Sequence, residues 1–235
     1  MAAGGVTAGP FDGVVDGAEV TKALERVRAR ITAAGGDLER ITLVAVTKGF
    51  DIDAVRAVRA AGVADLGENY AQELRAKSDA LDDAGARWHF VGRIQRNKIP
   101  LIATDVALWH GVDRLAVGDA IARRVPGAAV LVQVDVTGEP QKGGCPPAEV
   151  PGLIEQLRAA GLDVRGLMAV GLAGPPEDAR RGFRLVAALA DDVGLDERSM
   201  GMSDDLEVAV EEGATMVRIG RALLGPRPAA ARARR

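Results

Sequence analysis

Residues 41–47 read ITLVAVT, a continuous apolar run that is rich in β-branched residues. Such runs are typical of strands that are buried on both faces, as in parallel sheets covered by helices. A second run, AAVLVQVDV at residues 128–136, is the least ambiguous strand of the sequence. The two runs together favour an α/β fold built on a parallel sheet.

Strand and helix patterns alternate on both sides of these runs. The predicted strands cover residues 41–47, 63–67, 87–92, 105–112, 128–136, 162–170, 199–202 and 214–220. The helices predicted between them cover residues 52–61, 69–84, 95–102, 114–124, 147–161 and 176–193, then a stretch from residue 203 and a short one at the end. Eight strand–helix units predict a single (β/α)8 TIM barrel with right-handed connections.

An extra helix precedes the first strand. Its apolar residues Val20, Leu24, Val27 and Ile31 repeat at helical spacing and share one face. We expect three regions in the chain of 235 residues: a flexible lead-in at 1–17, the barrel at 18–227, and a disordered basic tail at 228–235.

Composition excludes several classes of protein. One Cys and two His leave no internal disulfide and little for a metal centre, so no metal site is predicted. The net charge of -3 gives no reason to expect nucleic acid as a partner. No apolar run is long enough to span a membrane, and the N-terminus lacks the features of a signal peptide. A cytoplasmic protein is therefore expected.

Functional residues of such barrels lie at the C-terminal ends of the strands. The first strand ends in Thr47-Lys48-Gly49. A lysine there either reaches solvent or lies in a partly dry pocket, where a lowered pKa would let the neutral amine form a Schiff base. The second strand ends at Asn69, which could equally cap the following helix.

The ends of strands seven and eight indicate an anion site. Ser203 is a good N-cap before a helix, and Gly220 lets the backbone approach a ligand closely. Many barrels bind phosphate in these two loops. Asp204 and Asp205 would repel a phosphate, so they must point away if the site exists.

Five motifs then stand in a recognisable order: VAVTK at 44–48, GENYAQE at 67–73, WHFVGRIQRNK at 88–98, SMGMSDDLE at 199–207 and MVRIGRALLG at 216–225. With these motifs the chain resembles, over residues 20–227, the pyridoxal 5′-phosphate (PLP) homeostasis proteins. This YggS/PROSC family has a barrel like the N-terminal domain of alanine racemase.

The resemblance implies a monomeric barrel that holds PLP. It implies that Lys48 carries PLP as a Schiff base, that Ser203 and the backbone of Gly220 and Arg221 hold its phosphate, and that Arg218 faces its pyridine nitrogen. Asn69 and Met202 would line the pocket. The family often has His in place of Arg93 and Thr in place of Arg221, and the second change removes a hydroxyl near the phosphate.

An arginine at the pyridine nitrogen can only donate a hydrogen bond, so the ring stays neutral and stabilises carbanions poorly. Racemisation also needs two bases, and related racemases take a tyrosine from an added domain of a partner subunit. The only tyrosine here, Tyr70, follows strand two. The leading hypothesis is a protein without catalytic residues that buffers PLP or delivers it to apo-enzymes, supporting vitamin B6 and amino-acid homeostasis.

Two alternatives stay open from the sequence. One is a PLP-dependent amino-acid racemase of low activity, and the other is an aldolase that uses Lys48 without a cofactor. The loop GEPQKGG at 138–144 contains Lys142, which either is simply exposed or helps to receive and hand over the cofactor. The sequence identifies no recipient enzyme.

Overall fold

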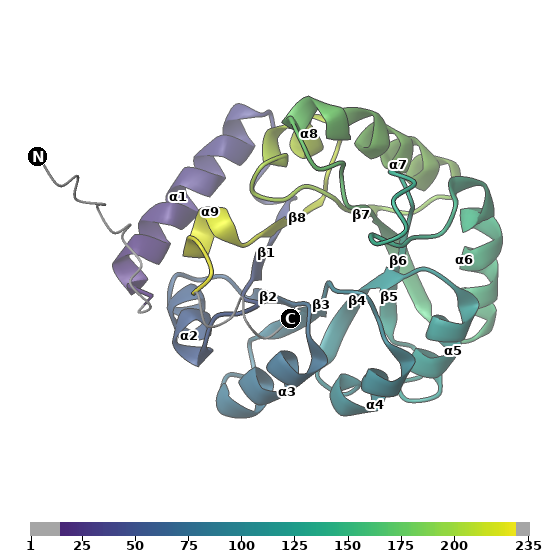
Figure 1. The fold of residues 1–235 in the computed structure, drawn as a ribbon, viewed down its shortest axis with the longest axis horizontal. Coiled ribbons are helices and arrows are strands. Elements are labelled where there is room, and N and C mark those ends of the chain that lie inside the picture. The colour runs from purple at the N-terminus through teal and green to yellow at the C-terminus, as the bar shows by residue number, and fades with distance from the viewer. Residues whose placement is uncertain (1–14, 229–235) are drawn as a thin grey trace, which may run out of the picture.

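The computed structural model describes residues 15–228, which form a closed barrel of eight parallel strands (Figure 1). The first and last strands close the ring, since Thr42 pairs with Met216 and Ala45 with Ile219. The predicted (β/α)8 barrel and the helix before it are confirmed. The predicted flexible lead-in (1–17) and disordered tail (228–235) lie almost wholly outside the described residues.

The strands follow the barrel in chain order. They are β1 Thr42–Val46, β2 Asp65–Glu68, β3 Arg87–Phe90, β4 Val106–Val112, β5 Ala129–Gln133, β6 Asp163–Met168, β7 Glu197–Ser199 and β8 Met216–Ile219.

The helices form a ring around the strands (Figure 1). They are α1 Gly17–Ala33, α2 Ile52–Ala60, α3 Ala71–Ala80, α4 Ile99–Ile102, α5 Leu115–Ala122, α6 Val150–Ala159, α7 Arg180–Asp192, α8 Leu206–Glu211 and α9 Arg221–Leu224. Short 3-10 turns at Arg96–Lys98, Pro147–Glu149 and Pro176–Ala179 precede α4, α6 and α7. The predicted apolar face of α1 is buried, and α1 packs against α2, α8 and α9.

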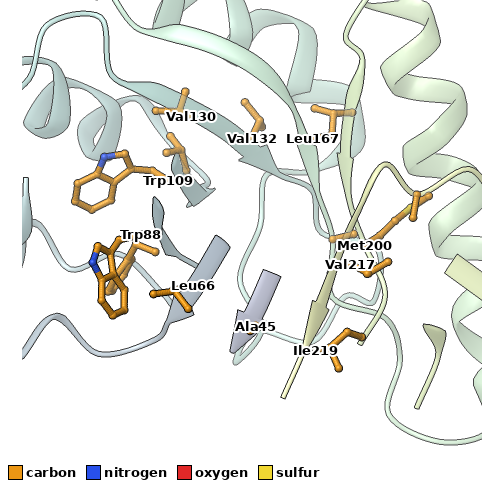
Figure 2. Close-up of a cluster of buried hydrophobic side chains, with 14 of the residues drawn as sticks. Ala45, Leu66, Trp88, Trp109, Val130, Val132, Leu167, Met200, Val217 and Ile219 are labelled. Carbon is orange, nitrogen blue, oxygen red and sulfur yellow. The ribbon is translucent and has the colours of Figure 1, made fainter. Parts of the chain in front are cut away.

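Side chains alternate between the two faces of each strand and so build two cores. The outer core lies between the strands and the helices, and Figure 2 shows part of it, including Trp88, Trp109 and Leu167. The inner core fills the barrel with Val44, Leu108, Ala129, Leu131, Met168 and Met216. Side chains therefore fill the interior of the barrel, below the site that lies at the C-terminal ends of the strands.

Three predicted boundaries are wrong in detail. Strand β7 is Glu197–Ser199, whereas the sequence pattern placed it at 199–202, because a charged Glu-Arg pair does not look like a buried strand. Helix α8 begins at Leu206 and not at Ser203. Helix α3 begins at Ala71, so Asn69 does not cap it, and the residue at the cap position, Tyr70, makes no side-chain cap bond.

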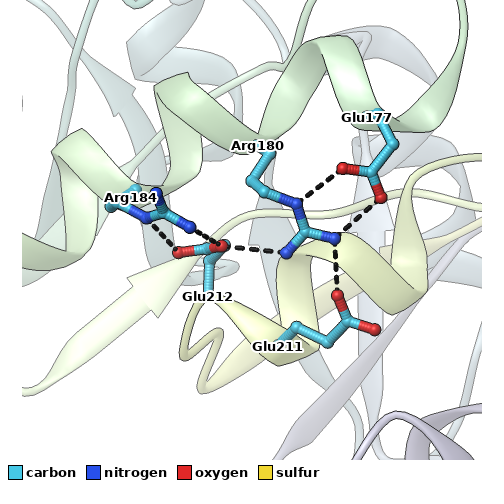
Figure 3. A network of polar contacts seen from close by, with 5 residues as sticks. All are labelled: Glu177, Arg180, Arg184, Glu211 and Glu212. Atoms are coloured by element: carbon cyan, nitrogen blue, oxygen red, sulfur yellow. Dashed lines mark hydrogen bonds and ion pairs between the residues drawn. The ribbon is translucent and has the colours of Figure 1, made fainter.

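A network of charged side chains joins α7 to α8 on the outside of the barrel (Figure 3). Arg180 donates hydrogen bonds to Glu177, Glu211 and Glu212, and Arg184 adds two more to Glu212. The two helices that flank β7 are thereby fixed to each other.

Candidate functional site

A cavity of about 340 Å³ opens at the C-terminal ends of the strands. Its lining residues include all seven that were named from the sequence: Lys48, Asn69, Met202, Ser203, Arg218, Gly220 and Arg221. The lining is completed by Val46, Phe50, Val91, Val170, Gly225 and Arg227, which the sequence reasoning did not single out. Residues at or after the ends of six strands therefore converge on one small-molecule-sized cavity.

Lys48 is the second residue after β1, and side chains of α3 hold both of its neighbours in the chain. The Lys77 ammonium donates to the carbonyl oxygen of Thr47 at 2.8 Å, and the amide of Gly49 donates to Glu73 at 2.7 Å. Gly49 has a φ of 76°, a left-handed conformation that favours glycine. The backbone on both sides of Lys48 is thus fixed, so the direction in which its side chain leaves β1 is set.

The same contacts belong to a polar cluster, which we call the Lys48 clamp: the buried residues Thr47, Glu68 and Lys77 and the partly exposed Glu73. Glu68 is fully buried and accepts hydrogen bonds from the Lys77 ammonium at 2.5 Å and from the Thr47 hydroxyl at 2.6 Å. Burial raises the pKa of the Glu68 carboxyl, and the Lys77 ammonium offsets part of that rise. Sequence reasoning missed this clamp, although Glu68 and Glu73 lie within the GENYAQE motif.

Asn69 lines the cavity, and its side-chain oxygen is buried without a hydrogen-bond partner. Buried polar atoms are nearly always paired, so this oxygen is available to a hydrogen-bond donor of a ligand in the cavity. The backbone of Asn69 lies against Gly92, where an added Cβ would be 2.4 Å from the Asn69 carbonyl oxygen. Gly92 is therefore needed for this packing of the second and third loops.

Arg218 rises from β8 into the floor of the cavity and is almost completely buried. Its guanidinium donates to the carbonyl oxygens of Ser199 and Ala169 at 2.6 and 2.7 Å, and to the Ser199 hydroxyl at 2.7 Å. Burial lowers its pKa to about 10, so it stays charged at neutral pH. The cavity floor is therefore a fixed cation that can donate a hydrogen bond but cannot act as a base.

Ser203 does not cap the helix that follows it. Its hydroxyl instead accepts a hydrogen bond from the Ala222 amide at 3.0 Å, which joins the loop after β7 to α9. Arg30 of α1 donates to the Ser203 carbonyl at 3.0 Å and pairs with Glu207. The extra N-terminal helix thus supports the turn that borders the cavity.

Asp204 and Asp205, which would repel an anion, both point away from the cavity. Asp205 is buried and turns back to accept a hydrogen bond from the Met202 amide at 2.5 Å. Asp204 pairs with the guanidinium of Arg221, and both side chains are about two-thirds exposed. Neither aspartate lines the cavity, and the Arg221 guanidinium extends to the surface.

The remaining candidates lie outside this cavity. Lys142 donates to the Gly171 carbonyl at 2.9 Å and to Glu139 at 2.6 Å, so it joins the loops after β5 and β6. Tyr70, Arg93 and Lys98 line a neighbouring cleft of about 280 Å³. Within residues 15–228, no group of three or more His, Cys, Asp or Glu side chains could hold a metal, and no helix could cross a membrane.

Comparison with known proteins agrees with this arrangement. The family model of the alanine racemase N-terminal domain matches residues 22–228. A pyridoxal phosphate homeostasis protein of Pseudomonas aeruginosa is 43% identical over 220 residues, which are 88% of this chain and 94% of the relative. The chain belongs to the pyridoxal phosphate homeostasis protein family. A relative from Deinococcus radiodurans is also 43% identical, over 87% of this chain and 98% of its own.

Solved structures give the same fold. PipY of Synechococcus elongatus, solved with PLP bound, is 30% identical with a TM-score of 0.76 and covers 88% of this chain and 100% of its own. An alanine racemase of Clostridium difficile is 16% identical with a TM-score of 0.70, and the match covers 89% of this chain and 61% of the racemase. This second likeness shows the fold alone, and the family resemblance predicted from the motifs is confirmed.

Proposed function

We propose that this protein binds PLP reversibly through Lys48 and buffers it or delivers it to apo-enzymes, without turning over amino acids. Two findings on relatives support the proposal: similar proteins are named for pyridoxal phosphate homeostasis, and PipY has been solved with PLP bound. The chemistry of the cavity supports it independently.

The cavity fits an anionic ligand. The cationic side chains of Lys48, Arg218 and Arg227 line it, whereas the guanidinium of Arg221 pairs with Asp204 at the surface, and no carboxylate of the described chain lines it. This charge is complementary to a phosphate, for which Ser203 and the backbone of Gly220 stand beside the cavity. The buried oxygen of Asn69 still needs a partner, and the amide of that side chain offers both a donor and an acceptor to a polar ring substituent.

When bound, PLP supplies an aldehyde carbon for amines and a ring that can withdraw electrons. Lys48 contributes the primary amine for that carbon, and the Lys48 clamp orients it. Arg218, buried and charged at neutral pH, would donate a hydrogen bond to the ring nitrogen without giving up its proton. The residues present therefore bind and hold the group but do not increase its electron-withdrawing power.

One observation carries the proposal that there is no turnover. Apart from the Lys48 amine, the side chains that line the cavity in the described chain include no carboxylate, imidazole, phenol or thiol that could serve as a second base. Racemisation needs a second base on the opposite face of the substrate carbon. Tyr70, the only tyrosine, lines the neighbouring cleft and is 40% exposed.

Turnover and transfer can be measured separately on the PLP-loaded protein. We expect no conversion of L- to D-alanine or L- to D-serine above the rate of free PLP, together with release of PLP when an amine or an apo-enzyme is added. Conversion that is lost in Lys48→Ala would instead establish the racemase alternative. Aldol cleavage by the cofactor-free protein would establish the aldolase alternative.

A role in delivery is tested at Lys142, whose hydrogen bond to Gly171 joins the loop after β5 to the loop after β6 and whose bond to Glu139 stays within its own loop. We propose that this contact opens during hand-over. Transfer to an apo-enzyme at the wild-type rate by Lys142→Ala would refute that role. The monomeric state and the cytoplasmic location stay predictions, and light scattering of the purified protein tests the first.

A further inference from the structure

A chain of hydrogen bonds runs through the inside of the barrel and ends at Arg218. Asp65 of β2 is 2.9 Å from His89 Nε2, and His89 Nδ1 is 2.9 Å from His110 Nε2. His110 Nδ1 is 2.9 Å from the Ser199 hydroxyl, which is 2.7 Å from Arg218. All five side chains are buried and come from five different strands.

When both rings are neutral, the two ends of this chain of hydrogen bonds fix the direction of every bond in it. Arg218 can only donate, so the Ser199 oxygen accepts from it, and a neutral His110 with its proton on Nε2 accepts the Ser199 proton at Nδ1. An ionised Asp65 can only accept, so His89 donates to it from Nε2. The proton between the two rings must then sit on His110 Nε2, facing the lone pair of His89 Nδ1.

The electrostatics agree with this direction. Burial alone would raise the pKa of Asp65, but hydrogen bonds from His89 and Arg87 outweigh it and lower the pKa, so the anion persists. Complete burial, with His89 and Arg218 nearby, lowers the pKa of His110 well below its ordinary value and keeps that ring neutral. Glu197 of β7 is a further charged group near His89, with which it interacts electrostatically.

We propose that His89, His110 and Ser199 are positioning residues for the cofactor site. Both histidine rings are neutral and carry their proton on Nε2. Every hydrogen bond then runs in the same direction, from Arg218 through Ser199, His110 and His89 to Asp65, and this holds the guanidinium of Arg218 in place. Arg87 donates to Asp65 at the far end and has a side chain that is 58% exposed. The chain therefore connects the cofactor site to the opposite mouth of the barrel.

Nitrogen-15 NMR of histidine tests the chain without any cofactor, and the sequence has only two histidines. At neutral pH we expect two neutral rings, each with its proton on Nε2, and no protonation of His110 as the pH falls through 6.5, its ordinary pKa. A charged His110 ring, or a proton on its Nδ1, would overturn the proposal.

The link between these hydrogen bonds and the cofactor is tested by removing the Ser199 hydroxyl. This test rests on the proposed function. Ser199→Ala is expected to weaken PLP binding about tenfold or more, as losing a hydrogen bond to a charged group does, and Ser199→Thr to restore much of it. Ser78→Ala is the control, because that hydroxyl bonds Asp105 on the outer face of the barrel.

A second measurement separates the positioning role of Ser199 from the proposed binding of PLP. Adding PLP to the wild-type protein should shift the His110 ring nitrogens, and the shift should be lost in Ser199→Ala. If PLP binds the wild type but Ser199→Ala has the same affinity and the same shift, the positioning role is refuted. If PLP does not bind the wild type, the proposed function fails. The histidine tautomers measured by NMR still test the hydrogen-bond chain from Asp65 to Arg218.

Discussion

Replacing Lys77 with methionine removes the cation from the Lys48 clamp while keeping the length of the side chain. Lys77 is buried, and its ammonium is 2.5 Å from Glu68, 2.8 Å from the Thr47 carbonyl and 3.5 Å from Glu73. Glu68 is fully buried, and its second carboxylate oxygen already has no partner. The variant therefore leaves a buried carboxylate without a countercharge.

Breaking one partner of a buried ion pair costs about 3–5 kcal/mol, because the remaining charge stays desolvated. We expect Lys77→Met to lower the free energy of unfolding by that amount. The double variant Glu68→Gln, Lys77→Met has no buried charge left at this pair and should recover most of the loss.

The pH dependence has a definite sign. Burial raises the pKa of Glu68 above its ordinary value of 4.5, so the folded state favours the protonated carboxyl. Such a group destabilises the fold above that pH, and its penalty fades as the pH falls toward it. The gap between Lys77→Met and the wild type should therefore be larger at mildly alkaline than at mildly acidic pH.

Urea unfolding followed by tryptophan fluorescence measures these energies, since Trp88 and Trp109 are both buried. Lys22→Met is the matched control, because Lys22 forms only an exposed pair with Glu19 and its loss should not change stability measurably. A loss below about 1 kcal/mol for Lys77→Met, or a double variant no more stable than the single one, would refute the reasoning.

Three further predictions concern packing, reactivity and the site. Gly166→Ala would place a Cβ 1.9 Å from a β7 carbonyl oxygen and should cost about 3 kcal/mol in urea unfolding, whereas Gly152→Ala, in an open helical position, should stabilise by about 0.5–1 kcal/mol. Burial raises the pKa of Cys145 to about 11, so the thiol should react with a thiol reagent at neutral pH only after unfolding, and a native reaction would contradict this. Gly92→Ala should displace the Asn69 backbone and weaken PLP binding about tenfold in a spectral titration, and unchanged affinity would remove Asn69 from the site.

The order of the elements could be predicted because apolar runs and helical spacing are local signals. The strand ends pointed to Lys48, Asn69, Ser203 and Gly220, and the family resemblance added Met202, Arg218 and Arg221. The structure brings all seven to one cavity. β7 was misplaced because its short strand is mostly charged, and its pairing partners β6 and β8 determine it.

The contacts between strands could not be predicted from local signals. Lys77 lies in a polar helix, where a lysine normally faces solvent, and its burial depends on Glu68 pointing outward from β2. The hydrogen bond between His110 and Ser199 joins residues 89 positions apart in the chain. Such contacts depend on the register of the closed barrel, which a single sequence does not reveal.

The central claim is that Lys48 is the amine that binds PLP. The sequence has five lysines: Lys22, Lys48, Lys77, Lys98 and Lys142. PLP-loaded protein, reduced with borohydride, digested and mapped by mass spectrometry, should carry the pyridoxyl adduct on Lys48. The adduct should disappear in Lys48→Arg and remain in Lys142→Arg. An adduct on another lysine, or none in the wild type, would contradict the account.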